Sequence, residues 1–194
     1  MSPRRKEFSK EVAVERAVDA FWEHGFHGAS MEVLVRRTGV NRFSLYGTFG
    51  DKRGLFEEAC RSYTAKMFES RVSLMEGKNS AMDSIEAFFE SAIGPNQGAG
   101  KEKGCLMTNS IIELALHDKA FRKMAEVFLN RLEAAFRNAL GNAKKRGEIR
   151  PDCHVADLAA HLTCLTQGVG VLVRSGKLAS DLKSVIKKAL EMMR

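Results

Sequence analysis

Apolar residues recur at intervals of three and four along most of the chain, the spacing that places them on one face of an α-helix. No stretch shows the strict alternation that is typical of a β-strand. The pattern predicts helices over residues 9–24 and 31–38, a very short helix after Asn41, a helix from Lys52, and further helices around 85–89, 106–116, 119–145, 154–175 and 181–193. The sequence therefore predicts an all-α fold of about nine helices.

Helix boundaries are marked by polar side chains and by loop-forming residues. Ser30, Asn41 and Asp51 each stand before a predicted helix, where their side-chain oxygens can accept hydrogen bonds from the first backbone N–H groups. Residues 94–104 combine a proline, four glycines and several charges, and residues 147–152 place a proline ahead of a new apolar pattern. Both segments predict loops between helices.

Charge and hydropathy narrow the class of protein. The 194 residues carry 31 basic and 24 acidic side chains, and the formal net charge of +7 allows a nucleic-acid partner without demonstrating one. The N-terminal residues have mixed charge and contain no apolar signal segment, and no uninterrupted apolar run approaches the ~18 residues of a membrane helix. We therefore expect a cytoplasmic chain without a membrane partner.

The four cysteines lie far apart and form no Cys-x-x-Cys pair, so neither a zinc site nor a disulfide framework is indicated. We expect free thiols, of which Cys60, Cys153 and Cys164 are structural. No cofactor and no metal ion are expected.

Two short predicted helices are joined through Thr38-Gly39-Val40, which is the sequence form of a helix-turn-helix. The glycine lets the backbone turn tightly, and the second helix is then free to enter a DNA major groove. Many helical domains contain such a turn, so the spacing alone leaves DNA binding and other roles about equally open.

The residues around this turn form a more specific set. It consists of Phe21 with Gly25-Phe26, the turn Gly39-Val40, the block Leu45-Tyr46-x-x-Phe49, and Asp51-Lys52 with Leu55. With these residues, the segment 17–59 resembles the DNA-binding domain of the TetR family of transcriptional repressors. Phe43 departs from the family pattern, which has a small residue or proline there. Two later stretches, 104–116 and 147–176, also resemble the C-terminal half of one branch of the family.

The resemblance implies an N-terminal three-helix helix-turn-helix domain in residues 1–50 and a larger helical ligand-binding and dimerisation domain in residues 51–194. It also implies a homodimer through the last two helices, where Gly168 and Gly170 permit close helix approach. A twofold dimer places its recognition helices about one DNA turn, roughly 34 Å, apart, so the expected partner is a double-stranded, palindromic operator.

The side chains expected to contact DNA lie at the ends of the short helices, where donors can reach phosphates. Arg42 is the expected reader of a guanine edge, and Phe43 can press on a thymine methyl group. Tyr46 and Lys52 are expected at phosphates, although Tyr46 could instead fill the core and Lys52 could be an ordinary solvated helix start. The full set is Ser30, Arg42, Phe43, Ser44, Tyr46, Thr48 and Lys52, with residues 4–6 as a basic arm.

Cys105 is the candidate sensor of an electrophile or oxidant, because it opens a predicted helix and follows Lys101 and Lys103. Both the helix end and the lysines favour the thiolate. The alternative, which the sequence favours about two to one, is a buried small hydrophobic residue. A small-molecule inducer would instead bind among apolar residues of the central helices, such as Phe68, Phe88, Phe89, Met107 and Ile111. The sequence favours an ordinary core role for each of them, because Met and Phe at helical spacing occur in any helical bundle.

Three classes of protein remain open for an all-helical chain of this kind. An enzyme is disfavoured because the sequence contains no Walker loop, dinucleotide-binding glycine motif, nucleophile elbow or His-Glu-x-x-His pair. A helical protein-interaction adaptor leaves the grouping of Arg42, Tyr46 and Lys52 around the turn unexplained. We therefore predict a dimeric, sequence-specific DNA-binding repressor that a small molecule or thiol modification releases, with the adaptor as the alternative.

Overall fold

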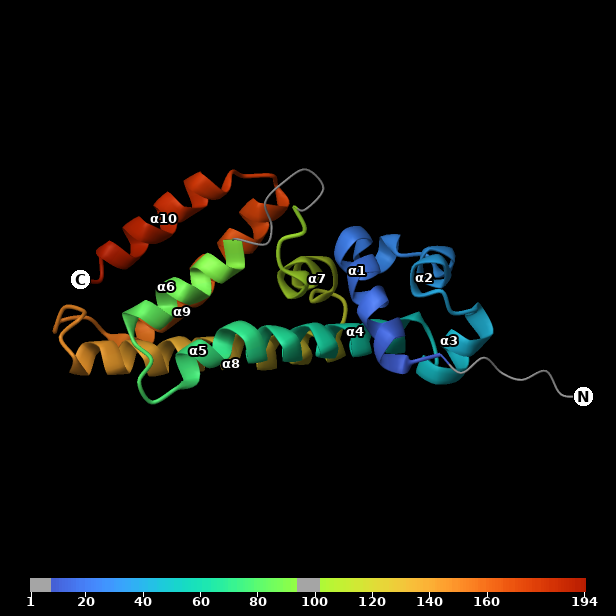
Figure 1. The fold of residues 1–194 in the computed structure, drawn as a ribbon, viewed down its shortest axis with the longest axis horizontal. Helices are drawn as coiled ribbons and strands as arrows, with labels where there is room; N and C mark the ends of the chain where they lie inside the picture. The colour runs from blue at the N-terminus through green and yellow to red at the C-terminus, as the bar shows by residue number, and fades with distance from the viewer. Residues whose placement is uncertain (1–7, 94–101) are drawn as a thin grey trace, which may run out of the picture. The chain divides into compact units, whose positions relative to one another are not determined.

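The computed structural model of the chain describes residues 8–93 and 102–194, and Figure 1 shows its helices. They are α1 (Lys10–Gly28), α2 (Met31–Thr38), α3 (Arg42–Phe49), α4 (Lys52–Met67), the π-helical turn η1 (Phe68–Val72), α5 (Ser73–Glu76), α6 (Met82–Ile93), α7 (Leu106–Leu114), α8 (Lys119–Lys145), α9 (Val155–Arg174) and α10 (Ala179–Glu191). Because α4, η1 and α5 follow one another without a break, these residues form nine helical segments, and they contain no strand. The predicted all-α class is confirmed.

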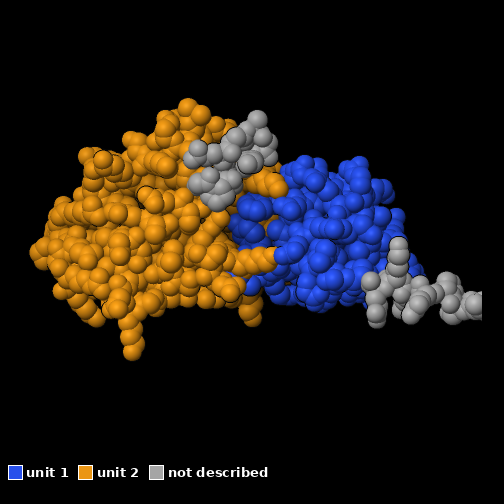
Figure 2. Space-filling model, viewed as in Figure 1, with its two compact units in different colours: residues 1–65 blue, residues 66–194 orange. Residues whose placement is uncertain are grey.

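The chain divides into two compact units, residues 1–65 (unit 1) and residues 66–194 (unit 2), which Figure 2 shows in different colours. The boundary that the sequence predicts, after residue 50, falls at the start of α4, whereas this division places most of α4 in unit 1. The predicted basic arm at residues 4–6 and most of the predicted loop 94–104 lie outside the described residues.

Unit 1 is built from short helices whose starts are fixed by side-chain caps. Ser30 Oγ accepts a hydrogen bond from the Val33 N–H at 3.3 Å, and Asn41 Oδ1 accepts one from the Ser44 N–H at 2.9 Å. Asp51 Oδ1 accepts one from the Gly54 N–H at 2.7 Å. The three predicted caps are confirmed, as are the predicted bounds of α2.

The first helix is kinked near its C-terminal end. Gly25 is not helical, with φ of 73° and ψ of 176°, so the regular helix ends at residue 24 as predicted, and α1 resumes after this kink and runs to Gly28. The bend brings the Phe26 ring to 5.0 Å from the Phe56 ring, and Phe56 in turn lies 5.1 Å from Phe21. These aromatic side chains form the centre of the unit 1 core.

Unit 2 is organised around α8, which buries one long apolar face against α6, α7 and α9. Phe136, which is fully buried, lies 5.3 Å from the ring of Phe88 and 5.9 Å from that of Phe89. Phe128 contacts Phe68 at a centroid distance of 5.7 Å. The core of unit 2 is therefore aromatic along much of the length of α8.

The loop between α5 and α6 is held by polar side chains from distant parts of unit 2. Asn138 Nδ2 donates to the Gly77 carbonyl oxygen at 3.1 Å, and Asn142 Nδ2 donates to that of Ser80 at 3.0 Å. Glu148 Oε2 accepts a hydrogen bond at 3.1 Å from the Met82 N–H, the first of α6. These long-range hydrogen bonds satisfy the backbone groups of the loop and the helix start.

Close helix approach occurs within unit 2, between α7 and α9. A Cβ atom added at Gly170 would lie 3.3 Å from Cys105 Cβ and 3.4 Å from Thr108 Oγ1, so the absence of a side chain lets α9 approach α7. The expectation that Gly170 serves close approach at a dimer interface is therefore wrong. Gly168 has no atom within 4 Å of such a position and faces open space.

Candidate DNA-binding site

The turn between α2 and α3 is held by a continuous set of hydrogen bonds. Gly39 adopts the left-handed conformation, with φ of 73° and ψ of 13°, and its N–H donates to the Val35 carbonyl oxygen at 2.9 Å. Thr38 Oγ1 donates to the Leu34 carbonyl oxygen at 2.7 Å and accepts from the Val40 N–H at 3.2 Å. Thr38 and Val40 are buried beneath the turn, and the two helices with this turn form a helix-turn-helix.

The N-terminal end of α3 presents its side chains to solvent. Phe43 is 73% exposed, which is unusual for a phenylalanine side chain, and Arg42 is also exposed. Leu45 and Phe49 on the opposite face are buried and hold α3 against the rest of unit 1. The structure therefore places Arg42 and Phe43 where a recognition helix carries its base-reading residues.

Arg42 and Tyr46 are linked one helical turn apart. Arg42 Nη2 donates to the Tyr46 hydroxyl at 3.2 Å, and the guanidinium lies 5.5 Å from the centre of the Tyr46 ring. The hydrogen bond and the electrostatic interaction with Tyr46 raise the pKa of Arg42, so its charge is constant across the physiological range. Tyr46 is half-buried, and its hydroxyl lies beside the exposed Arg42 instead of in the core.

Lys52 lies at the N-terminus of α4, as predicted, but it also has a partner within unit 1. Its ammonium donates to the His27 carbonyl oxygen at 3.3 Å and lies 4.8 Å from the centre of the Phe26 ring. These contacts hold the ammonium against the C-terminal end of α1. An ammonium has three donors, so a phosphate can bind here without displacing both contacts.

The three remaining predicted residues are hydroxyl-bearing side chains with different exposure. Thr48 is exposed on α3, whereas Ser30 and Ser44 are half-buried. Ser30 Oγ accepts the cap hydrogen bond of α2, and its hydroxyl also hydrogen-bonds the Glu32 carboxylate, so a phosphate contact of Ser30 would replace that second bond.

The sequence prediction did not include Arg16, which lies on α1. Its Nη1 donates to the carbonyl oxygen of Thr38 at 3.1 Å, across 22 residues of chain. No local pattern could have indicated this contact, because Arg16 occupies an ordinary exposed position of an amphipathic helix.

The predicted sensing residues lie in unit 2. Cys105 is the N-cap residue of α7 and is half-buried, and Met107 is fully buried two residues further along. Ile111 is half-buried, and Phe68 and Phe88 pack on other aromatic side chains in the core. Cys60 and Cys153 are buried, as expected for structural residues.

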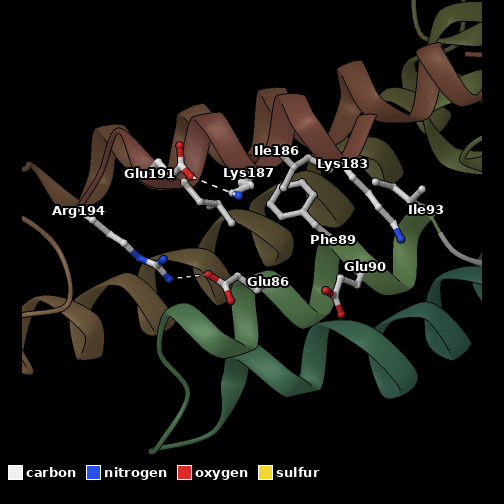
Figure 3. Close-up of a pocket in the computed structure, with 10 residues that line it drawn as sticks. Glu86, Phe89, Glu90, Ile93, Lys183, Ile186, Lys187, Glu191 and Arg194 are labelled. Carbon is white, nitrogen blue, oxygen red and sulfur yellow. Dashed lines mark hydrogen bonds and ion pairs between the residues drawn. The ribbon is translucent and has the colours of Figure 1, made fainter. Parts of the chain in front are cut away.

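Cys164, in contrast, is exposed on α9, so the expectation that it is a structural residue is wrong. Phe89 is the predicted sensing residue that lines an open groove of about 340 Å³ between α6 and α10 (Figure 3). One end of the groove is closed by the ion pair of Arg194 with Glu86 at 2.5 Å. The groove has an apolar floor between charged walls and is lined by Glu86, Phe89, Glu90, Ile93, Lys183, Ile186, Lys187, Leu190, Glu191 and Arg194.

Comparisons with known proteins bear on both units. Residues 13–59 match the model of the bacterial regulatory proteins of the tetR family, and residues 81–188 match the tetracyclin repressor-like C-terminal domain. The chain is 32% identical to the uncharacterized HTH-type transcriptional regulator YezE of Bacillus subtilis over 160 residues, which are 82% of each chain. It is 27% identical to the HTH-type transcriptional repressor ComR of Escherichia coli, over 97% of this chain and 90% of ComR.

Solved structures share the fold over nearly the whole chain. A cysteine-substituted form of the TetR family regulator CifR, complexed with a 26-bp double-stranded operator DNA, superposes with a TM-score of 0.86 at 24% identity and covers 98% of this chain and 100% of CifR. The reduced form of Escherichia coli NemR gives a TM-score of 0.78 at 17% identity, with 96% of both chains covered. Together with the two family models, which span most of both units, these findings show that the chain belongs to the TetR family and is a DNA-binding transcriptional regulator.

Proposed function

We propose that this regulator is a dimeric repressor that occupies a palindromic operator through α3 of each protomer. The observation that carries the proposal is the exposed pair Arg42 and Phe43 at the start of a helix that the turn after Thr38 holds away from α2. Repressor relatives such as ComR support the direction of regulation. A protein that acts on chromosomal DNA works in the cytoplasm, where we place this chain.

In this proposal the contacts divide into two kinds. Arg42 donates to a guanine edge, and Phe43 packs on a thymine methyl group. Tyr46 and Lys52 bind phosphates on either side of the groove and set the register of the helix on the duplex. The hydroxyl groups of Ser30, Ser44 and Thr48 donate further hydrogen bonds to the sugar-phosphate backbone of the DNA.

The proposed dimer forms through α9 and α10. A groove of about 670 Å³ with mainly apolar walls runs between these helices, and exposed apolar side chains such as Val185 and Met192 stand beside it. By length and composition, α9 is also the one described helix that could cross a membrane. Because α9 packs along α8 and is followed by the amphipathic α10, its exposed apolar surface fits a second copy of the chain better than lipid.

The first test is selection of bound DNA fragments at about 0.15 M salt, followed by affinity measurements on the enriched sequence. Enrichment of palindromic fragments is the expected result, and no enrichment of any sequence would leave the protein-interaction adaptor as the better interpretation.

Arg42→Ala should cost about 1–3 kcal/mol of binding free energy at one base position, whereas Lys52→Ala should weaken binding to all sequences and lower the slope of log affinity against log salt by about one. Arg36→Ala, on the exposed face of α2, is the matched control.

We propose further that the repressor is released through unit 2, either by a small molecule or by modification of Cys105. In the second case the thiolate attacks a peroxide, the O–O bond breaks, hydroxide leaves and a sulfenic acid forms. Cys105 stands where α7 contacts Gly170 of α9, so an added oxygen atom there would disturb a tightly packed contact. Cys105→Ser should abolish release by peroxide, and Cys164→Ser, which changes an exposed thiol on α9, should not.

A further inference from the structure

Arg16 joins α1 to the turn of the helix-turn-helix. Thr38 is the last residue of α2, so its carbonyl oxygen is one of those that an α-helix leaves without a partner inside the helix. Arg16 Nη1 donates to this oxygen at 3.1 Å. The interaction therefore satisfies the end of α2 from a different helix, at the point where the chain turns toward α3.

The turn leaves room for the guanidinium because residue 39 is glycine. A Cβ atom at Gly39 would lie 3.3 Å from Arg16 Nη1, closer than most side-chain contacts. The same glycine supplies the left-handed φ of 73° that the turn requires. The shape of the turn and the position of Arg16 thus depend on each other.

Electrostatics favour the same placement. The C-terminal end of a helix carries a partial negative charge, and a cation there is stabilising. Arginine keeps its charge at every physiological pH and offers several donors in a fixed plane. Arg16 is therefore suited to hold one geometry of the turn instead of switching between two.

We propose that Arg16 is a positioning residue for DNA recognition. By binding the Thr38 carbonyl oxygen it fixes the angle at which α3 leaves the turn, and so the place where the side chains of α3 meet the bases. The eight residues of α3 span about 12 Å, so a rotation of about 10° at the turn moves its far end by about 2 Å. Such a shift is larger than the tolerance of a hydrogen bond. The inference rests on the proposed function.

The test compares Arg16→Gln with Arg37→Gln. Both substitutions remove one positive charge and one link between α1 and α2, because Arg37 forms an ion pair with Glu23 of α1. The Arg37 link does not involve the carbonyl oxygens of the turn. Affinities for the selected operator and for a scrambled duplex of equal length and composition are measured at several salt concentrations, together with thermal unfolding by circular dichroism.

We expect Arg16→Gln to reduce the ratio of operator to scrambled affinity about tenfold, and Arg37→Gln to leave that ratio unchanged. Arg16→Lys, which keeps one donor and the charge, should recover part of the ratio. An ordinary phosphate contact would lower both affinities equally and reduce the salt slope, which would overturn the inference.

Three further results would also overturn it: an unchanged ratio in Arg16→Gln, the same loss in Arg37→Gln, or failure of Arg16→Gln to fold. In the last case Arg16 stabilises the fold of unit 1 and has no separate role in placing α3. The proposed function fails separately, if the unaltered protein prefers no DNA sequence.

Discussion

In unit 1 every helix begins at a side-chain cap, whereas in unit 2 the helices α9 and α10 begin at His154 and Leu178 without one. The caps of unit 1 are Ser9, Ser30, Asn41 and Asp51. Two of its helices have only eight residues, and helices of that length are marginal without help. Unit 2 instead contains α8, which has 27 residues and a long buried face.

The difference shows that the two units are stabilised in different ways. A cap contributes roughly 1 kcal/mol, which matters for a helix of two turns and little for a helix of seven. Burial of a large side chain contributes several times as much, and it does not fix where a helix starts. Unit 1 is thus specified locally, which suits a surface that must match a DNA groove, while unit 2 is specified by packing between distant helices.

The largest expected effect is in the core of unit 2. Phe136→Ala removes a fully buried ring that contacts Phe88 and Phe89, and it should lower the free energy of unfolding by about 3–5 kcal/mol. Val127→Ala, on the same helix but 64% exposed, is the control and should have little effect. Urea denaturation followed by circular dichroism gives both values, and similar losses for the two variants would contradict the role of packing.

The next effect concerns the contact between α7 and α9. Gly104 has a φ of 65°, and a Cβ atom there would overlap the carbonyl oxygen of Gly170. Gly104→Ala should therefore cost about 3 kcal/mol, the sum of backbone strain and steric overlap. Gly176→Ala introduces the backbone strain alone, because φ is 81° and no atom lies within 4 Å of the added Cβ. It should lower the free energy of unfolding by about 1 kcal/mol. Equal thermal unfolding of the two variants would show that the helices can separate without cost.

A cap in each unit gives a direct comparison. Asn41→Ala and Asp118→Ala remove the same kind of hydrogen bond from α3 and α8, and each should cost about 1 kcal/mol of stability. Operator affinity should fall only in Asn41→Ala, because Asn41 fixes the start of α3, the helix that we propose enters the DNA groove. Binding titrations on both variants check this, and an equal fall in both would mean that the local caps of unit 1 have no special role in recognition.

The smallest effect is a pH dependence at the start of α2. Hydrogen bonds to the Glu32 backbone N–H and to Ser30 lower the pKa of the Glu32 carboxyl below its ordinary value of 4.5. Because the folded pKa is the lower one, the ionised carboxylate stabilises unit 1 above pH 4.5, and this contribution is lost as the pH falls through the folded pKa. Glu32→Gln should melt slightly earlier than the unaltered protein at pH 7, and the difference between the two melting temperatures should shrink as the pH falls below 4.5. A constant difference across this range would exclude the ionisation as its cause.

Much of the DNA-binding unit could be predicted from sequence because its signals are local. The caps Ser30, Asn41 and Asp51 act within three residues of themselves, so each is visible in the sequence beside the helix that it starts. The exposed position of Arg42 and Phe43 follows from their place after such a cap and opposite the apolar Leu45. The break at Gly25 was also predicted, but the short helical continuation after it was not, because Phe26 packs on Phe56 of α4, which is distant in sequence.

The helical class, the short capped helices and the residues that α3 presents could all be predicted from the sequence. Three contacts became visible only in the folded chain: Arg16 binds the turn from α1, Gly170 meets α7, and Asn138 binds the loop after α5, 61 residues away. The two groups differ in the range of the interactions that define them. A cap or an apolar period is complete within a few residues, whereas the partner of a buried face or a distant hydrogen-bond donor is selected by the packing of the whole unit.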